Sequence, residues 1–162
     1  MRRKEVKMKA WAWILILIII LGLGVSGYFL FGLSKPNTEF LQKNSNVAAF
    51  YLDLQQEIDI AWKSQNYEFQ FEVNLPSEIN GICFVDFSSA ITQQSDYSQV
   101  QNYKSFMANL VLLPTEKTDT PYVILQHINI QETTKNKNPY CVLTSKSLTI
   151  KKGFYEALVT IE

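Results

Sequence analysis

The stretch from Ala10 to Leu33 contains no charged residue, and Ser26 is its one side chain with a clearly polar head. As an α-helix, its 24 residues would measure about 36 Å, enough to cross a hydrocarbon layer of about 30 Å with some tilt. A helix in a soluble core is seldom this long or apolar on every face. The sequence therefore predicts a transmembrane helix over residues 10–33.

The flanks of this stretch predict its orientation. Residues 1–9 carry five basic side chains and one acidic one, a net charge of +4, and the neutral total leaves −4 for the remainder. The positive-inside rule places this basic tip in the cytoplasm and the rest of the chain outside the cytoplasmic membrane, as a single-pass protein. The aromatic side chains of Trp11, Trp13 and Tyr28 suit the two headgroup levels. The lipid bilayer is the expected partner; nucleic acid is not, because the remainder has no basic stripe.

A cleaved signal peptide is the alternative interpretation of the same stretch. The segment "GVSG" resembles a small-residue cleavage site, but the apolar run continues past Gly27 through "YFLFGL". This continuation favours a retained anchor. Gly22 and Ser26 form a small-xxx-small pair that would let a second helix approach, or else reflect the ordinary glycine content of membrane helices.

A second helix is predicted directly after a proline break. Pro36 stops the first helix, and Val47, Tyr51, Leu54, Ile58 and Ala61 then repeat at helical spacing. We expect a linker and amphipathic stalk helix within 34–66, the helix itself covering 38–63. Its apolar stripe packs either on the protein's own sheet alone or also on another copy or another envelope protein. Asp53 and Glu57, on its polar face, are candidate contact residues.

From Asn66 onward the period changes from helical to strand-like. The segment "YEFQFEVNL" alternates apolar and polar residues, as a half-buried strand does. Further strands are predicted at 82–87, 106–114 and 121–131, and in "YCVLTS", "SLTI" and "ALVTIE", with a turn region at 132–139. We predict an α+β fold in which residues 67–162 form an extracytoplasmic, β-rich domain around one antiparallel sheet.

The polar segment 88–105 interrupts this run of strands. It is rich in Gln, Ser and Tyr, and Tyr97, Val100, Tyr103 and Met107 have the spacing of a short helix. We interpret it as an exposed excursion. Tyr97 and Tyr103 are therefore candidate residues of an interaction surface.

Cys83 and Cys141 are the two cysteines of the chain. Outside the cytoplasm pairing is expected, and a bridge would close a loop of about 59 residues, worth roughly 4 kcal/mol as an upper guide. Two buried free thiols are the other possibility. A metal site is disfavoured, because two isolated cysteines and one histidine lack metal-ligand spacing.

The sequence offers few candidates for catalysis. His127, in "ILQHINI", is predicted on a strand face with Val123, Leu125 and Asn129, as an edge-of-core residue. No phosphate loop, H-E-x-x-H, G-x-S-x-G or C-x-x-C motif occurs. We expect no catalytic residue, metal or cofactor. An envelope enzyme with an unrecognised site is kept as an alternative.

The predicted layout is a basic tip, an apolar helix, a proline break and an amphipathic helix, followed by an antiparallel sheet with an expected late disulfide. This layout resembles type IV pilin-like proteins, whose apolar segment packs in a filament core. The resemblance implies cleavage by a prepilin peptidase after Lys9-Ala10, so that the mature chain would begin at Trp11, although bacterial members carry a glutamate where this chain has Leu15. "LPSEINGICFVDF" and "NPYCVLT" also look like segments of small archaeal membrane-anchored proteins. The expected function is binding or assembly at the cell envelope, with a filament subunit as the alternative.

Overall fold

The computed structural model describes the backbone of residues 38–162 and the side chains of residues 45–162. Within this range, Phe40–Glu162 form one compact unit. The predicted anchor helix lies outside the described residues, as do Lys9-Ala10, Trp11, Trp13, Gly22, Ser26 and Tyr28. Among the helices that are described, none has the length and apolarity to cross a membrane.

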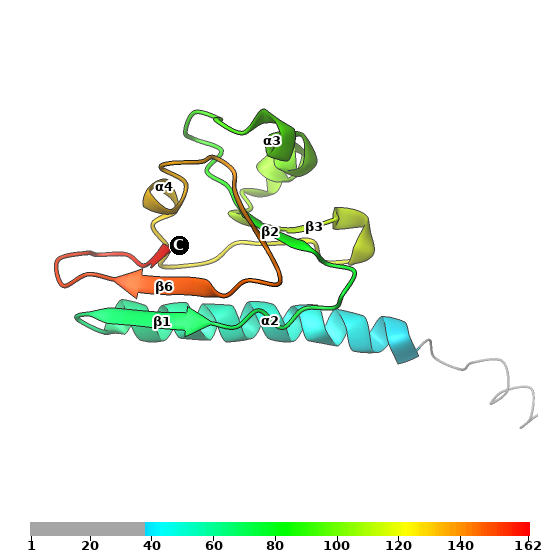
Figure 1. The fold of residues 1–162 in the computed structure, drawn as a ribbon, viewed down its shortest axis with the longest axis horizontal. Coiled ribbons are helices and arrows are strands. Elements are labelled where there is room, and N and C mark those ends of the chain that lie inside the picture. Colours follow the sequence, from blue (N-terminus) through cyan, green and yellow to red (C-terminus); the bar gives the residue numbers. More distant parts are fainter. Residues whose placement is uncertain (1–37) are drawn as a thin grey trace, which may run out of the picture. The chain divides into compact units, whose positions relative to one another are not determined.

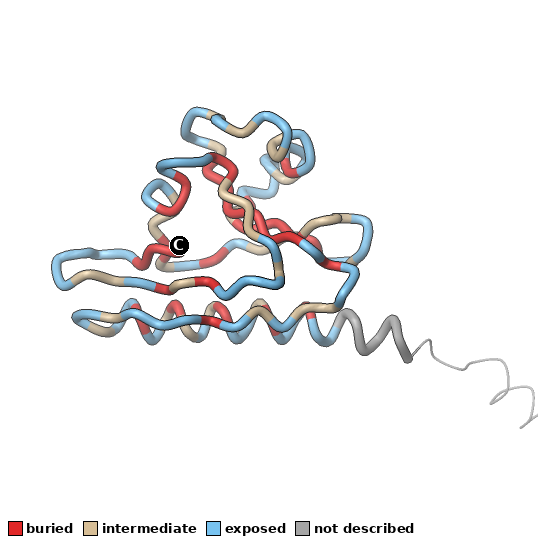
Figure 2. Tube along the Cα trace, in the orientation of Figure 1, coloured by how far each residue is buried: buried red, intermediate tan, exposed pale blue. Residues whose placement is uncertain are grey.

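Helix α2, Thr38–Lys63, has the bounds expected from the sequence (Figure 1). Four residues of the expected stripe are buried and Tyr51 is half-buried, because this face packs against the sheets (Figure 2). Phe50 is also buried and widens the apolar face beyond that stripe. Lys152 caps the C-terminal end of α2: its Nζ donates hydrogen bonds to the main-chain oxygens of Trp62 and Ser64, at 2.6 and 2.7 Å.

Seven strands and four short helical segments follow α2. The strands are β1 Tyr67–Phe71, β2 Gly81–Phe84, β3 Leu110–Leu113, β4 Tyr122–Val123, β5 Tyr140–Leu143, β6 Leu148–Lys152 and β7 Thr160–Ile161. The helical segments are α3 Gln94–Val100, the 3₁₀ helices η1 Gln101–Phe106 and η2 Thr115–Lys117, and α4 Ile130–Thr133.

The strands form two antiparallel sheets, so the α+β class is observed but the expected single sheet is wrong. One sheet has the order β1-β6-β7 and the other β4-β3-β2-β5. The irregular segment 72–80 separates β1 from β2, and β1 pairs with β6 near the end of the chain. A period-two pattern reports which face of a strand is buried, but it does not name the partner strand.

Two hydrophobic clusters explain why β2 is buried on both faces. Ile82 and Phe84 join the larger cluster, which lies between the sheets and α2, whereas Cys83 joins a smaller cluster that includes Val100 of α3. Strands covered on both sides are continuous apolar runs rather than alternating ones. This arrangement fits the unbroken apolar sequence "ICFV".

The expected strand over 121–131 is mostly wrong. Only Tyr122–Val123 form a strand, and α4 begins at Ile130. Asn129 caps α4 by accepting a hydrogen bond from the backbone N–H of Glu132 at 3.2 Å. His127 has a φ of 61° and so cannot continue a strand. Its expected strand face with Val123, Leu125 and Asn129 therefore does not exist.

The remaining segments follow the sequence more closely. The strand expected over 106–114 is confined to β3, and the turn region expected at 132–139 begins within α4. Asn138 fastens the base of the 88–105 excursion from this turn region. Its side chain accepts a hydrogen bond from the N–H of Asp86 at 3.1 Å and donates to the carbonyl oxygens of Asp86 and Ala90 at 2.8 and 3.2 Å.

Candidate functional site

The 88–105 segment projects from the four-stranded sheet and carries α3 and η1, as expected of an exposed excursion with a short helix. Tyr97 and Tyr103 are half-buried and pack against the smaller hydrophobic cluster. Phe87 meets Tyr97 edge-on, with ring centroids 6.3 Å apart. These two tyrosines thus fix the excursion to the sheet, and the most exposed apolar residues here come just after them.

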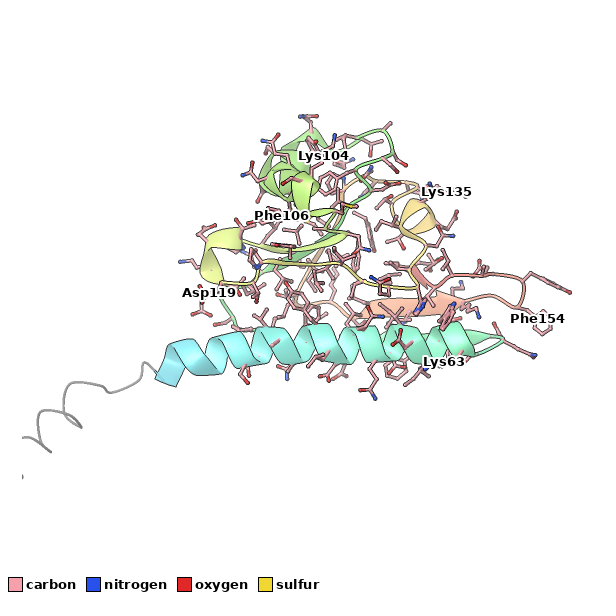
Figure 3. The ribbon with its side chains drawn as sticks, turned by 180° about the vertical axis from the view of Figure 1, so that it is seen from behind. Lys63, Lys104, Phe106, Asp119, Lys135 and Phe154 are labelled. Atoms are coloured by element: carbon pink, nitrogen blue, oxygen red, sulfur yellow. A yellow bond between two sulfur atoms is a disulfide. The ribbon has the colours of Figure 1, made fainter. Side chains whose placement is uncertain are left out.

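Those exposed residues belong to an aromatic patch, which we define as Tyr103, Phe106, Met107 and Tyr122. The Phe106 ring lies 5.0 Å from that of Tyr122 and 6.5 Å from that of Tyr103. Phe106 is 52% and Met107 71% exposed. Figure 3 shows Phe106, the last residue of η1, on the side of the domain away from α2. The sequence indicated Tyr103 as a contact residue and gave Met107 helical spacing, but it did not indicate Phe106 or Tyr122, because both lie in apolar segments that predict strands.

Met107 has an unusual backbone conformation. Its φ is 54° and ψ 28°, the left-handed region, and its N–H donates to the carbonyl oxygen of Lys104 at 3.1 Å, ending η1. Glycine or asparagine usually occupies such a position, since other residues pay roughly 1–2 kcal/mol there. A large apolar side chain is therefore presented to solvent at a position that does not favour it. Such outliers gather at functional sites.

The two acidic candidates of the stalk helix have different surroundings. Glu57 is half-buried and accepts a hydrogen bond from the Tyr67 hydroxyl. Burial, followed by this hydrogen bond, raises the pKa of Tyr67 to about 12. Asp53 is exposed and borders a small hollow of about 70 Å³ between α2 and the end of β1. The structure thus brings Glu57 into the domain's own packing and leaves Asp53 on the surface.

His127 lies against the C-terminal half of α2. Its Nδ1 is 3.0 Å from Oδ1 of Asp59, and its ring stacks on Trp62 with centroids 3.7 Å apart. Gln55 supports this arrangement: its Nε2 donates to Asp59 at 2.9 Å and its Oε1 accepts from the N–H of Gln126 at 2.8 Å. The pKa of Asp59 is lowered, mainly by the hydrogen bond with His127, which outweighs the opposing effect of burial.

A histidine beside a carboxylate is a possible general base, because the carboxylate orients the ring and stabilises its charged form. Here the pair is about one-third exposed on each side chain. Neither the 70 Å³ hollow near Asp53 nor a larger one near Gly81 is lined by His127. In the described part of the chain, no group of three or more His, Cys, Asp or Glu residues could hold a metal ion. The contacts found for this histidine are thus those of a residue that fastens 125–128 to α2.

Cys83 and Cys141 face each other across β2 and β5. They are register partners, their sulfur atoms are 2.07 Å apart and their Cα atoms 4.0 Å. Residues directly opposite each other at a non-hydrogen-bonded position of an antiparallel pair approach in this way. The cysteine pair is thus at disulfide distance, joining segments separated by 58 positions.

Comparison with protein-family models, curated proteins and solved structures gave no match to this chain.

Proposed function

We propose that this protein is a single-pass, membrane-anchored binding module of the cell envelope, with its N-terminus in the cytoplasm and its folded domain outside. The uncharged stretch 10–33 supports the anchor and the basic tip supports the orientation. The role is recognition or assembly of another envelope protein. A disulfide between Cys83 and Cys141 would stabilise the domain in that oxidising space.

The aromatic patch is the single observation that carries the binding role. Aromatic side chains and methionine are enriched in the cores of protein interfaces. Phe106 and Met107 are largely exposed, while Tyr103 and Tyr122 hold the patch on the domain. Phe106 lies on the side of the domain away from α2, the helix that follows the anchor stretch in the sequence (Figure 3).

Two epitope tags test the anchored topology. We expect a C-terminal tag to bind antibody on intact cells, and an N-terminal tag to bind only after permeabilisation. The full-length protein should remain with membranes after washing with high salt. A C-terminal tag that needs permeabilisation, or a chain released into the supernatant, would contradict the anchored topology.

Photocrosslinking in living cells tests the patch. Benzoylphenylalanine replaces Phe106 in one strain and Gln131, an exposed residue of α4, in the matched control. We expect a defined adduct of higher mass from position 106 and none from position 131. Equal labelling from both positions would show that position 106 has no special contact.

A pilin-like filament subunit is the second candidate. It is favoured by the packing of α2, whose length is about 39 Å, along the β1-β6-β7 sheet. Intact-mass measurement separates the two proposals. A mature chain that begins at Trp11 supports the filament subunit, whereas a chain that retains Met1 rules it out.

A further inference from the structure

A notch interrupts the surface of the four-stranded sheet at Gly81. On β2, Gly81 is the register partner of Leu113 on β3 and of Leu143 on β5. These three residues form a row across the sheet in which the middle position has no side chain. The row lies on the same face as the Cys83–Cys141 pair, since residues two apart on a strand share a face.

The backbone does not require glycine at this position. The glycines of the described chain all have negative φ, and a Cβ built at Gly81 would meet Leu113 at 3.4 Å, an ordinary contact. Glycine inside a strand is destabilising by about 0.5–1 kcal/mol relative to alanine. The fold thus does not require glycine at position 81, and glycine there lowers stability. We take this as an indication that the open space above Gly81 has a use.

That space is a hollow of about 300 Å³, bordered by Leu113, Leu143 and Pro114. Asn80 and Gln99 are among its polar lining residues, and no charged side chain lines it. A charged guest would lose its hydration without gaining a partner of opposite charge. The hollow therefore suits a long, uncharged apolar side chain.

An unpaired strand edge lies beside the hollow. β5 is the last strand of its sheet. The N–H of Thr144 donates to the carbonyl oxygen of Asn80 on the β2 side at 3.1 Å. Main-chain groups alternate in direction along a strand, so those of Val142 also point toward β2, whereas the N–H and C=O groups of Cys141 and Leu143 point away from it. The oxygen of Leu143 accepts a hydrogen bond from the N–H of Lys146 in the following turn. Within the described residues, the N–H and C=O of Cys141 and the N–H of Leu143 are left for a new strand.

We propose that β5 and the Gly81 hollow together bind an extended, uncharged segment of a partner protein. The segment adds a strand to β5 through Cys141 and Leu143, and a methionine or phenylalanine side chain of the segment extends past Leu143 into the hollow. Strand addition of this kind draws affinity from main-chain hydrogen bonds and specificity from side-chain pockets. This site is separate from the aromatic patch. A negative result in the peptide test would therefore leave the proposed function standing, and a negative result in the crosslinking test would leave this proposal standing.

Selection from a displayed library of random heptapeptides tests this proposal. The target is the full chain, in nanodiscs if it needs lipid, with empty nanodiscs used to deplete the library. We expect enrichment of uncharged peptides with alternating apolar residues. Synthetic copies of the enriched peptides should bind Gly81→Val at least tenfold more weakly, because the valine methyl groups occupy the space directly above position 81. N-methylation of the amides that pair with β5 should weaken binding by a similar factor.

Two surface variants protect the test against misfolding of Gly81→Val. Gln99→Trp occludes the hollow from α3, and Ser98→Trp adds the same bulk one residue away, outside the lining. We expect Gln99→Trp to lose peptide binding and Ser98→Trp to retain it, both with the melting temperature of the parent.

Three results would overturn the proposal. The first is a selection that enriches no peptide over the depleted library. The second is a set of peptides that bind parent and Gln99→Trp equally. The third is a hollow that takes lauric acid instead, with fatty-acid binding lost in Gln99→Trp while no peptide is enriched.

Discussion

The imidazole ring of His127 lies flat on the indole ring of Trp62, with an angle of 4° between the two planes. The two residues come from an irregular segment and from the last turn of α2, and Asp59, one turn earlier on the helix, meets the same imidazole ring. The stacking covers part of the Trp62 ring, which is otherwise exposed at the end of the helix. A left-handed backbone at His127 is thereby held in place by two side-chain contacts.

The Asp59–His127 contact predicts a loss of stability in acid. The pKa of Asp59 is lowered in the folded state, mainly by its hydrogen bond with His127. A lowered folded-state pKa contributes stability that is present above the unfolded value, about 3.9, and is lost as the pH falls through the folded-state value. Asp59→Asn should therefore be less stable than the parent at pH 7, with a difference that shrinks below about pH 4.

Urea unfolding of the full chain at pH 7, 4 and 2.5 measures this difference. Asp53→Asn, an exposed position on the same helix, is the matched control and should follow the parent at every pH. Asp86 also has a lowered pKa: burial raises it, but hydrogen bonds from Ser88 and Ser89 outweigh burial. Some acid sensitivity should therefore persist in Asp59→Asn. A constant gap between this variant and the parent from pH 7 to 2.5 would show that the contact is not ionic.

Replacing Met107 by glycine should stabilise the fold but weaken binding at the aromatic patch. Met107→Gly relieves the left-handed strain, at the expense of extra freedom in the unfolded chain, and should raise the unfolding free energy by about 0.5–1 kcal/mol. The same change removes the most exposed side chain of the aromatic patch and should reduce the crosslink from position 106. Ser105→Gly, within η1, should instead destabilise by a similar amount. If Met107→Gly keeps the full crosslink, Met107 takes no part in the contact.

We expect the loss of the Asn138 side chain to lower the free energy of unfolding substantially. Asn138 is 2% exposed, and its side chain forms hydrogen bonds with both the N–H and the C=O of Asp86. Asn138→Ala leaves the buried N–H of Asp86 unpaired, at a cost of about 1–3 kcal/mol, and leaves its carbonyl oxygen with only the 3.4 Å hydrogen bond from the N–H of Ser89. We expect thermal unfolding to show a loss of at least about 2 kcal/mol. Asn136→Ala, an exposed neighbour in the same turn, should stay within about 0.5 kcal/mol of the parent, and equal losses in the two variants would exclude the buried network as the cause.

The sequence predicted those elements whose signal is local. α2 was predictable to the residue, because an apolar stripe repeating at three and four positions is specific to a helix with one buried face. The cysteine pair was expected from the predicted compartment, but its cross-strand register depends on the pairing of β2 with β5. Such long-range pairing is set by how complete faces pack together, which a single strand's pattern does not record.

The errors have the same physical origin. Leu125 and Ile128 are buried although neither belongs to a named strand. Their apolar side chains give this irregular segment a sequence pattern that resembles a strand. Phe106 and Met107 are apolar residues left outside the core, and their hydrophobicity therefore imitates the start of a strand at 106–114. The Gly81 notch became visible only when Leu113 and Leu143 were placed on either side of it.

The cysteine pair supplies the last prediction. Cys83 and Cys141 are 58 positions apart, so a bond between them removes much freedom from the unfolded chain. Loop-closure arithmetic gives about 4 kcal/mol as an upper figure. The double variant Cys83→Ala and Cys141→Ala should therefore lose about 2–4 kcal/mol, and reduction of the parent should lower its melting temperature to a similar extent. Maleimide labelling in denaturant should find no thiol before reduction and two afterwards. Two reactive thiols in the protein taken directly from cells would contradict the bond, and also the oxidising compartment from which it was inferred.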